Sequence, residues 1–170
     1  MDVVVACGLQ HAYFGKTGVR YLGEKADVLK VRLESFLKEE RAKGSTIFFA
    51  REVHQKEDPF YRTTKSHSLV GSPDIEIPEV FKPYVRLVLN TTRPSAFYMT
   101  PLESELHKVK PETVRVVGVE THMAILFTAE EFRNRGYPVI VPEALTASED
   151  DYLHGLGINL LANALSAVVL

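Results

Sequence analysis

The sequence contains a single cysteine, Cys7. One thiol can form neither a disulfide within the chain nor an all-cysteine metal site. Long apolar runs are also missing, since none approaches the about 20 residues that a membrane-spanning helix requires. The N-terminus, Met-Asp-Val-Val-Val, lacks the basic region and the cleavage site of a secretory signal. From these absences we expect a cytoplasmic protein that does not associate with membranes.

A large excess of one charge is missing as well. The 170 residues carry 20 basic and 22 acidic side chains, which gives a net charge of −2. Binding of nucleic acid requires a surplus of Lys and Arg on one face, so we expect no nucleic-acid partner. The length suits a single domain over residues 1–170, and a chain of this size can form a core without disulfides.

Three common functional motifs are absent. Gly15-Lys16-Thr17 resembles the end of a phosphate-binding loop, but such a loop needs another glycine five positions earlier, where this chain has Gln10. No paired glycines of the dinucleotide-binding kind follow the first strand-like segment. The Gly-x-Ser-x-Gly turn of serine hydrolases does not occur either. The sequence therefore offers no nucleotide-binding loop and no serine nucleophile of that type.

The sequence does contain a regular alternation of strand-like and helix-like segments. Short unbroken apolar runs predict buried strands, and apolar residues three and four positions apart predict helices between them. The expected strands cover residues 3–7, 47–50, 85–89, 113–119, 139–141 and 167–170. Such alternation favours parallel pairing with right-handed crossovers. We predict a three-layer αβα sandwich around a mainly parallel sheet of five or six strands.

Residues 51–84 interrupt this alternation. The segment has no clear apolar periodicity, and it contains Pro59, Pro73, Pro78 and Pro83. A loop of this length inside a compact domain is more often functional than idle. We therefore expect it to contribute to a ligand site.

Several short motifs occur in one order along the chain. Residues 116–147 read V-V-G-V-E-T-H-M-A-I-L-F-T-A-E-E-F-R-N-R-G-Y-P-V-I-V-P-E-A-L-T-A, residues 67–73 read H-S-L-V-G-S-P, and residues 95–102 read S-A-F-Y-M-T-P-L. Together with Leu9-Gln10, these segments resemble the isochorismatase-like cysteine hydrolases, the superfamily that includes nicotinamidase. The resemblance spans nearly the whole chain and implies the Rossmann-type fold of that superfamily.

The resemblance also implies a catalytic triad of aspartate, lysine and cysteine, but this chain differs at all three positions. They are occupied by Gly8, Thr91 and Ala124. A methyl group cannot act as a nucleophile, and glycine cannot accept a proton. Members of a catalytic triad act as a unit, so their joint loss removes the ordinary reaction. We therefore predict a non-catalytic binding or assembly member of the superfamily, a pseudoenzyme.

The alternative is a hydrolase of C–N bonds in small amides, or of related esters or vinyl ethers, whose chemistry has been relocated. Cys7 could supply the nucleophile, although alternation along a strand turns it away from the pocket that its neighbour Gly8 faces. A lone buried cysteine is commonly a core residue. His122, near a helix N-terminus, could act as a base, and Arg93 could restore positive charge unless it is a solvated loop residue.

A further route to hydrolysis is water activated by a metal ion. Nicotinamidase-like proteins bind metal through Asp-x-His and a second His after three further residues, and this spacing here gives Glu52, His54 and Asp58. These donors suit Zn²⁺, Mn²⁺ or Fe²⁺. Such residues are also common in charged loops, where Lys56 and Glu57 supply ion-pair partners. We expect no cofactor, with a divalent metal as the alternative.

The remaining expectations also come from the resemblance. His67 and His154 match superfamily positions and are expected to be structural hydrogen-bonding residues. Superfamily members form homo-oligomers, so we expect this chain to self-associate and to take a small-molecule ligand in the superfamily's pocket. The residues expected to line that pocket are Gln10, Phe14, His54, Phe97, Thr121 and His122.

Overall fold

The computed structural model describes residues 1–61 and 65–170. Within these ranges the strands form one parallel sheet of seven strands, in the order β3-β2-β1-β4-β5-β7, with β6 paired to β4. Six strands correspond to segments expected from the sequence, and the short β6 is additional. The strands are β1 (Val3–Cys7), β2 (Thr46–Glu52), β3 (Leu87–Thr91), β4 (Val114–Val119), β5 (Val139–Val141), β6 (Thr146–Ala147) and β7 (Val168–Val169).

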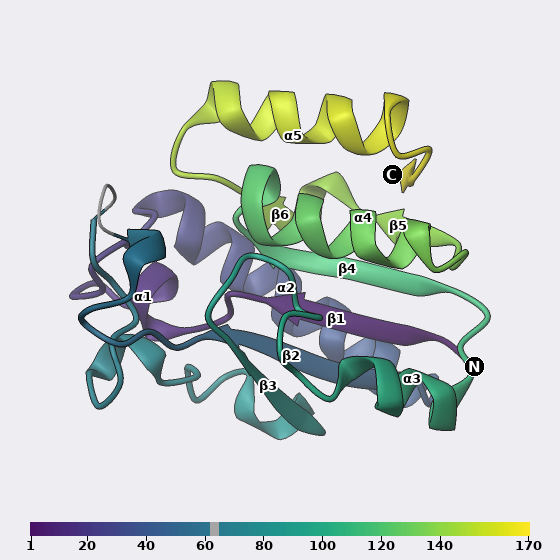
Figure 1. Cartoon of the computed structure of the whole chain (residues 1–170), viewed down its shortest axis with the longest axis horizontal. Coiled ribbons are helices and arrows are strands. Elements are labelled where there is room, and N and C mark those ends of the chain that lie inside the picture. The colour runs from purple at the N-terminus through teal and green to yellow at the C-terminus, as the bar shows by residue number, and fades with distance from the viewer. Residues whose placement is uncertain (62–64) are drawn as a thin grey trace.

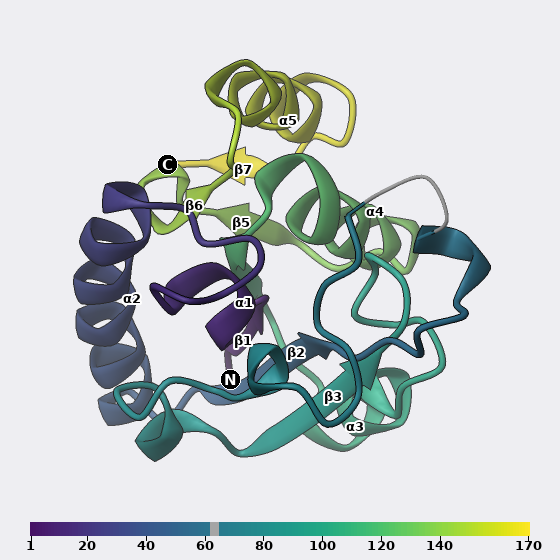
Figure 2. The same ribbon diagram turned by 90° about the vertical axis from the view of Figure 1, so that its left-hand side faces the viewer.

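Helices cover both faces of this sheet. Figure 2 shows α2 on one side of the strands and α3 and α4 on the other, while α5 lies beside α4 at the β7 edge (Figure 1). No helix within the described ranges is long and apolar enough to cross a membrane. The predicted three-layer αβα sandwich is confirmed. The helices are α1 (His11–Phe14), α2 (Glu24–Ala42), α3 (Leu102–Val109), α4 (Leu126–Asn134) and α5 (Asp151–Asn163).

The central strand β1 divides the core into two. Its side chains alternate, so Val3, Val5 and Cys7 pack toward α3 and α4, whereas Val4 and Ala6 pack toward α1 and α2. Each of these five residues is at most 1% exposed. Burial of both faces explains why β1 is an unbroken apolar run rather than an alternating one.

The helical segment that follows β4 begins differently from an ordinary α-helix. Its first residues, Thr121–Ile125, form a π-helical turn, and α4 follows from Leu126. Helix α5 packs closely on this turn, because a Cβ at Gly157 would lie 3.0 Å from the Cα of His122. The glycine inside α5, which weakens a helix on its own, therefore permits this contact.

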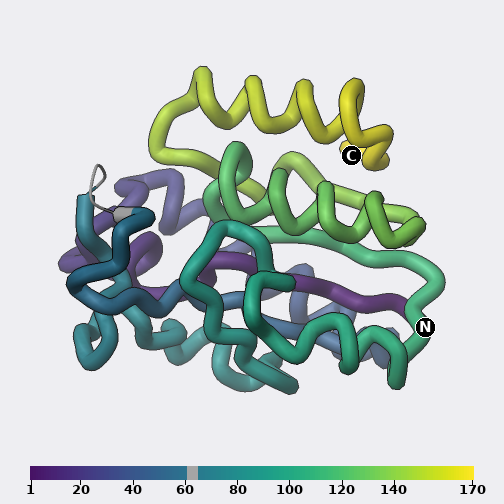
Figure 3. The backbone as a smooth tube through the Cα atoms, viewed as in Figure 1, coloured from purple at the N-terminus to yellow at the C-terminus, as the bar shows by residue number. Residues whose placement is uncertain are grey.

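The loop between β2 and β3 lies at the carboxyl end of the sheet. Its regular structure consists of the 3₁₀ turns Pro59–Tyr61, Pro73–Ile75 and Lys82–Tyr84. In Figure 3 it folds back past α1, at the end of the sheet opposite the N-terminus. Residues 62–64 of this loop lie outside the described residues. Ligand sites of parallel α/β sheets lie at this end, which agrees with the expected role of the loop.

Candidate functional site

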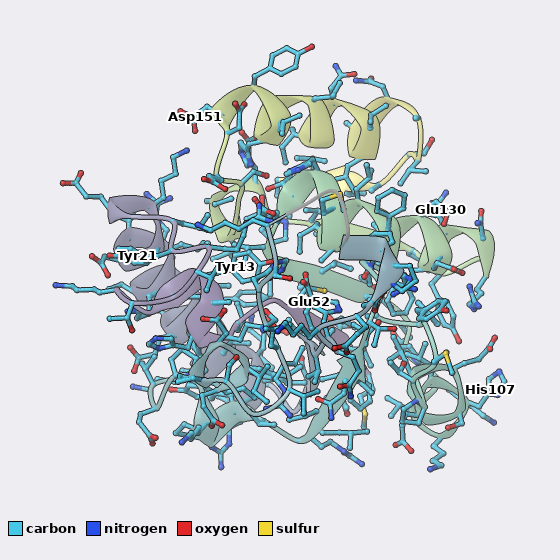
Figure 4. All side chains as sticks on the ribbon, turned by 60° about the vertical axis from the view of Figure 1, so that its left-hand side comes forward. Tyr13, Tyr21, Glu52, His107, Glu130 and Asp151 are labelled. Atoms are coloured by element: carbon cyan, nitrogen blue, oxygen red, sulfur yellow. The ribbon has the colours of Figure 1, made fainter. Side chains whose placement is uncertain are left out.

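Three buried side chains meet at the carboxyl end of β2. Glu52 Oε2 lies 2.8 Å from His67 Nε2 and 3.3 Å from His54 Nε2. The ligand atoms of the three residues all lie within 4.8 Å of one another, and each residue is at most 8% exposed. Figure 4 places Glu52 deep inside the molecule. A carboxylate and two imidazoles that converge in this way form a candidate metal site.

The backbone brings these three side chains together. Glu52 ends β2, and His54 forms a bridge with Leu69, in which His54 N donates to Ser68 O at 2.9 Å and Val70 N donates to His54 O at 2.9 Å. This pairing returns the loop to the end of β2. The return places His67 beside Glu52, although 15 residues separate them in the sequence.

The side chain of Gln10, which follows β1, forms hydrogen bonds with the end of β2 and with the loop. Its Oε1 accepts from Glu52 N at 2.9 Å, and its Nε2 donates to Glu52 O at 3.1 Å. The same Nε2 lies within 2.9 Å of Ser68 Oγ and 3.3 Å of Asp74 O. Gln10 therefore connects the end of β1 to β2 and to the loop that carries His67. It is fully buried and acts as a connector rather than as an open pocket residue.

Hydrogen bonds set the charges of the cluster. Burial alone raises the pKa of Glu52, but hydrogen bonds from His54 and His67 outweigh it and hold that pKa below its ordinary value. Burial alone lowers the pKa of His67, but the hydrogen bond and the negative charge of Glu52 outweigh it and raise that pKa. Glu52 is therefore a carboxylate at neutral pH.

The second ring nitrogen of His67 is also hydrogen-bonded. His67 Nδ1 lies 3.0 Å from Lys65 O, and a carbonyl oxygen can only accept, so Nδ1 carries a proton. A backbone carbonyl in this position is a common partner of metal-binding imidazoles, because it orients the ring and directs Nε2 at the ion. His67 Nε2 is the atom that faces Glu52.

Asp58, which the sequence spacing suggests as the third ligand, does not belong to this cluster. Its Oδ2 accepts from Arg93 Nη1 at 2.9 Å and its Oδ1 accepts from Phe60 N at 2.9 Å. It approaches the cluster only through a distance of 3.9 Å to His54 Nδ1. The structure therefore groups Glu52 and His54 with His67 rather than with Asp58, and His67, expected as a structural hydrogen-bonding residue, makes its hydrogen bonds within this cluster.

Arg93 is neither a solvated loop residue nor a lone positive charge. Besides its ion pair with Asp58, its guanidinium lies 4.8 Å from the ring centre of Phe60 and 5.4 Å from that of Tyr98. These contacts fix the side chain, and Asp58 balances its charge. Arg93 therefore supports the loop that contains Asp58.

The three positions of the expected triad are all buried at the carboxyl ends of their strands. Gly8 follows β1, Thr91 ends β3 beside Glu52, and Ala124 lies in the π-helical turn. Thr91 Oγ1 lies 2.9 Å from Arg93 O and 3.2 Å from Ser95 O, so its hydroxyl serves the local backbone. None of the three side chains offers a nucleophile with an adjacent base.

Gly8 has a conformation that excludes other residues. Its φ is +66°, in the left-handed region. A Cβ built there would lie 2.9 Å from Val119 Cγ2 and still closer to the Val119 carbonyl oxygen. The end of β1 is therefore shaped for glycine, and an aspartate at this position requires a different backbone.

Cys7 lies in the core and not in a pocket. It is 1% exposed, and its Sγ lies 3.8 Å from Thr128 Oγ1. Burial raises the pKa of the Cys7 thiol to about 12. A thiol in this state is a poor nucleophile at neutral pH.

Cys7 is therefore expected to resist thiol reagents in the native protein. With a pKa of about 12, only about one thiol in ten thousand would be ionised at pH 8. Absorbance after addition of Ellman's reagent should show almost no reaction in buffer and one thiol per chain in 8 M urea, where roughly all chains are unfolded. Full reaction within minutes in buffer would reinstate Cys7 as a candidate nucleophile.

The other residues expected to line the pocket contact residues outside the Glu52 cluster. Burial lowers the pKa of His122, whose Nδ1 lies 2.9 Å from Ser148 Oγ. Thr121 Oγ1 lies 2.8 Å from His154 Nδ1. Phe14 packs on Phe81 and Phe97 packs on Phe132, so both rings belong to the cores. Of the six residues expected to line the pocket, His54 belongs to the Glu52 cluster and Gln10 hydrogen-bonds to Glu52.

A cavity of about 350 Å³ adjoins the cluster at His67. The walls also include the polar side chains of His11, Ser66 and Ser72. A larger cavity of about 490 Å³ lies between α2 and the start of α5, away from Glu52. The smaller cavity is lined by one residue of the cluster, His67, whereas the larger cavity is not lined by any of the three.

The chain is similar to known proteins both in its sequence and in its fold. The isochorismatase domain family model matches residues 2–170. The chain is 23% identical to the uncharacterized isochorismatase family protein PncA of Bacillus subtilis, over 86% of each chain. It is also similar to the pyrazinamidase/nicotinamidase of Streptococcus mutans, with 21% identity, a TM-score of 0.90 and coverage of 100% of both chains.

A third similar protein is named for a different activity. The N-carbamoylsarcosine amidase of Thermoplasma acidophilum is 21% identical, with a TM-score of 0.88, and the match covers 99% of this chain and 94% of that one. At these identities the solved structures establish a shared fold. The fold by itself does not determine which reaction, if any, this chain performs.

Proposed function

We propose, because the chain belongs to the isochorismatase domain family, that it is a metal-binding member of that family without cysteine-based hydrolysis. The observation that carries this proposal is the buried convergence of Glu52, His54 and His67. The positions expected to supply the family's acid, amine and thiol are instead Gly8, Thr91 and Ala124.

The residues of the cluster fit a divalent metal ion. One carboxylate and two imidazoles are ligands suited to Zn²⁺, Fe²⁺ and Mn²⁺. The Lys65 carbonyl fixes the tautomer of His67, and Gln10 holds the backbone of Glu52. A bound ion would supply a Lewis acid that polarises a carbonyl group or lowers the pKa of water. The protein's own contribution is to orient the three ligands and to keep them buried.

Equilibrium dialysis tests the binding part of this proposal. The chain is dialysed against ZnCl₂ and then against metal-free buffer, and the retained ion is counted by mass spectrometry. We expect about one ion per chain, since the three donors form one cluster. The same dialysis is repeated with Mn²⁺ and Fe²⁺. The proposal would be contradicted if the chain retained none of the three ions.

A second candidate function is hydrolysis of C–N bonds in small amides with the help of that ion. The cavity beside His67 favours it, because a molecule in this cavity would lie next to the cluster. The names of the nicotinamidase and N-carbamoylsarcosine amidase relatives suggest amides as the substrates to examine first. Dependence of turnover on the added ion distinguishes this function from binding alone.

Restoring only the thiol is not expected to restore hydrolysis. Ala124→Cys supplies a nucleophile, but Gly8 offers no proton acceptor and Thr91 offers no positive charge. Ammonia release from nicotinamide by metal-free Ala124→Cys should therefore equal that of the metal-free wild type, at the level of the buffer. Turnover by this single variant would show that the assignment of the three positions or the mechanism is wrong.

A further inference from the structure

A serine and a histidine form a pair beside the start of α5. Ser148 follows β6, in the segment that leads to α5 (Figure 1), and His122 lies in the π-helical turn. The Oγ of Ser148 lies 2.9 Å from Nδ1 of His122, although 26 positions separate the two residues. A hydroxyl within hydrogen-bond reach of an imidazole is the arrangement in which a base activates a serine nucleophile. The fold therefore gives His122, a candidate base, a hydroxyl to act on.

Neighbouring residues hold both members of this pair in place. Lys25 Nζ donates to the carbonyl oxygen of Ser148 at 3.3 Å, and the peptide N–H of the next residue donates to Glu120 Oε1 at 3.2 Å. Helix α5 packs on His122, whose backbone N and Cα would lie 3.0 Å from a Cβ at Gly157. These contacts keep the hydroxyl and the imidazole at a fixed separation, which a proton transfer between them requires.

The surroundings of His122 favour its neutral form. Burial lowers the pKa of His122, and the positive charge of Arg20 acts in the same direction. The carboxylates of Glu120 and Asp150 oppose this change without outweighing it. At neutral pH the imidazole is therefore mostly uncharged. With its proton on Nε2, its Nδ1 can accept the proton of the Ser148 hydroxyl.

Ser148 lies in the wall of the larger cavity. This cavity of about 490 Å³ has the size of a site for a small organic molecule. Its walls also include Lys25 and the apolar side chains of Leu29 and Ala147. A positive charge bound to the same serine favours the oxyanion that forms when a hydroxyl attacks an ester. Because Ser148 is only 1% exposed, a molecule that reaches its hydroxyl must have a small acyl group.

A second pair of a hydroxyl and an imidazole adjoins this cavity. Thr121 Oγ1 lies 2.8 Å from His154 Nδ1. In this pair the imidazole lines the cavity, while Thr121 is fully buried in the π-helical turn. His154 would therefore contact a bound molecule, and Ser148 is the better placed of the two hydroxyls.

We propose that Ser148 and His122 form a serine esterase site at the larger cavity, with small esters of a short acyl group as substrates. Esters are the expected class because an alcohol leaves more readily than an amine does. The inference goes beyond the proposed function, since it uses residues outside the Glu52 cluster and needs no metal ion.

The reaction takes place in two balanced steps. In the first, the O–H bond of Ser148 breaks and its proton passes to His122 Nδ1, while Oγ bonds to the acyl carbon. The C–O bond of the ester breaks, and the leaving oxygen takes the proton from His122. In the second step, water attacks the acyl carbon and gives its proton to His122. The carboxylic acid leaves, and the Ser148 hydroxyl is restored.

The chromogenic ester 4-nitrophenyl acetate tests this site. The wild type is incubated with the ester in EDTA and quenched in acid, and peptide mass spectrometry locates the acetyl group. We expect acetylation of Ser148 together with steady release of 4-nitrophenolate. Ser104→Ala is the matched control and should react equally, because the Ser104 hydroxyl donates to a carbonyl oxygen, Pro101 O at 2.8 Å, and has no such base.

Ser148→Ala is expected to lose this acetyl group. His122→Ala should form it at least about 100-fold more slowly, which is the effect of a positioned general base. The proposal would be overturned by a wild type without acetyl on Ser148, or by a His122→Ala variant that reacts at the wild-type rate. The labelling site in the wild type is decisive even if a variant does not fold. Because EDTA is present, failure here would leave the proposed metal site standing, and failure to retain an ion in dialysis would leave this site standing.

Discussion

Gly8→Asp is expected to lower the free energy of unfolding by about 2–5 kcal/mol. A residue with a Cβ costs about 1–2 kcal/mol in the left-handed region, where Gly8 has a φ of +66°. Contact of the new Cβ with the Val119 carbonyl adds about 1–3 kcal/mol, because backbone atoms cannot move aside as the end of a flexible side chain can. Urea unfolding followed by circular dichroism measures the loss.

Gly136→Ala provides the control for this prediction. Gly136 has a φ of +81°, but a Cβ there would meet no atom within 4 Å, so this variant reports the conformational cost alone. We expect a loss of about 1 kcal/mol in this control. Gly8→Ala should resemble Gly8→Asp, since the clash arises from Cβ. A Gly8→Asp variant within about 1 kcal/mol of the wild type would show that the end of β1 is not specific for glycine.

His67→Ala is expected to weaken Zn²⁺ binding by at least about 100-fold, whereas Asp58→Ala should leave it within about tenfold of the wild type. His67 Nε2 faces Glu52 at 2.8 Å, so its removal takes one of three ligands from the site. Asp58 is held by Arg93 and lies 3.9 Å from His54 Nδ1, where it can act only on the orientation of that ring. Competition with a chromophoric chelator measures both affinities.

The comparison needs evidence that both variants fold. Thermal unfolding of the metal-free proteins supplies it, and Glu52→Gln serves as a third variant that removes the carboxylate but preserves the size of the side chain. Glu52→Gln should bind as weakly as His67→Ala. The ligand set would be wrong if Asp58→Ala lost the ion while His67→Ala retained it, and the original spacing-based set would then be correct.

The sequence predicted the sheet well because its signals are local. Residues 3–7 form an unbroken apolar run, and burial on both faces of a central parallel strand requires such a run. The small strand β6 was not expected, because the two residues Thr146 and Ala147 show no apolar periodicity. The π-helical turn at Thr121 was also missed, since its apolar spacing is close to that of an α-helix.

The site was only partly predictable, because it depends on contacts between distant residues. Glu52 and His54 are neighbours in the sequence and were identified together, whereas His67 reaches them only through the bridge between His54 and Leu69. The motif that begins at His67 could have suggested it as a ligand. Nothing in the sequence indicated the clash at Gly8, which arises from the approach of β4 to the end of β1.

The four hydrogen bonds of Gln10 have a consequence for how an ion would enter. A neutral amide fastens the loop to the sheet by bonds to Glu52, Ser68 and Asp74. No bond in this set involves an ion, so these bonds would hold Glu52 and the loop in place whether or not an ion is bound. In small zinc domains, by contrast, metal binding and folding are the same event. We therefore expect an ion to bind and dissociate without refolding of the site. Amide hydrogen exchange at the end of β2 should be almost equal with and without the ion.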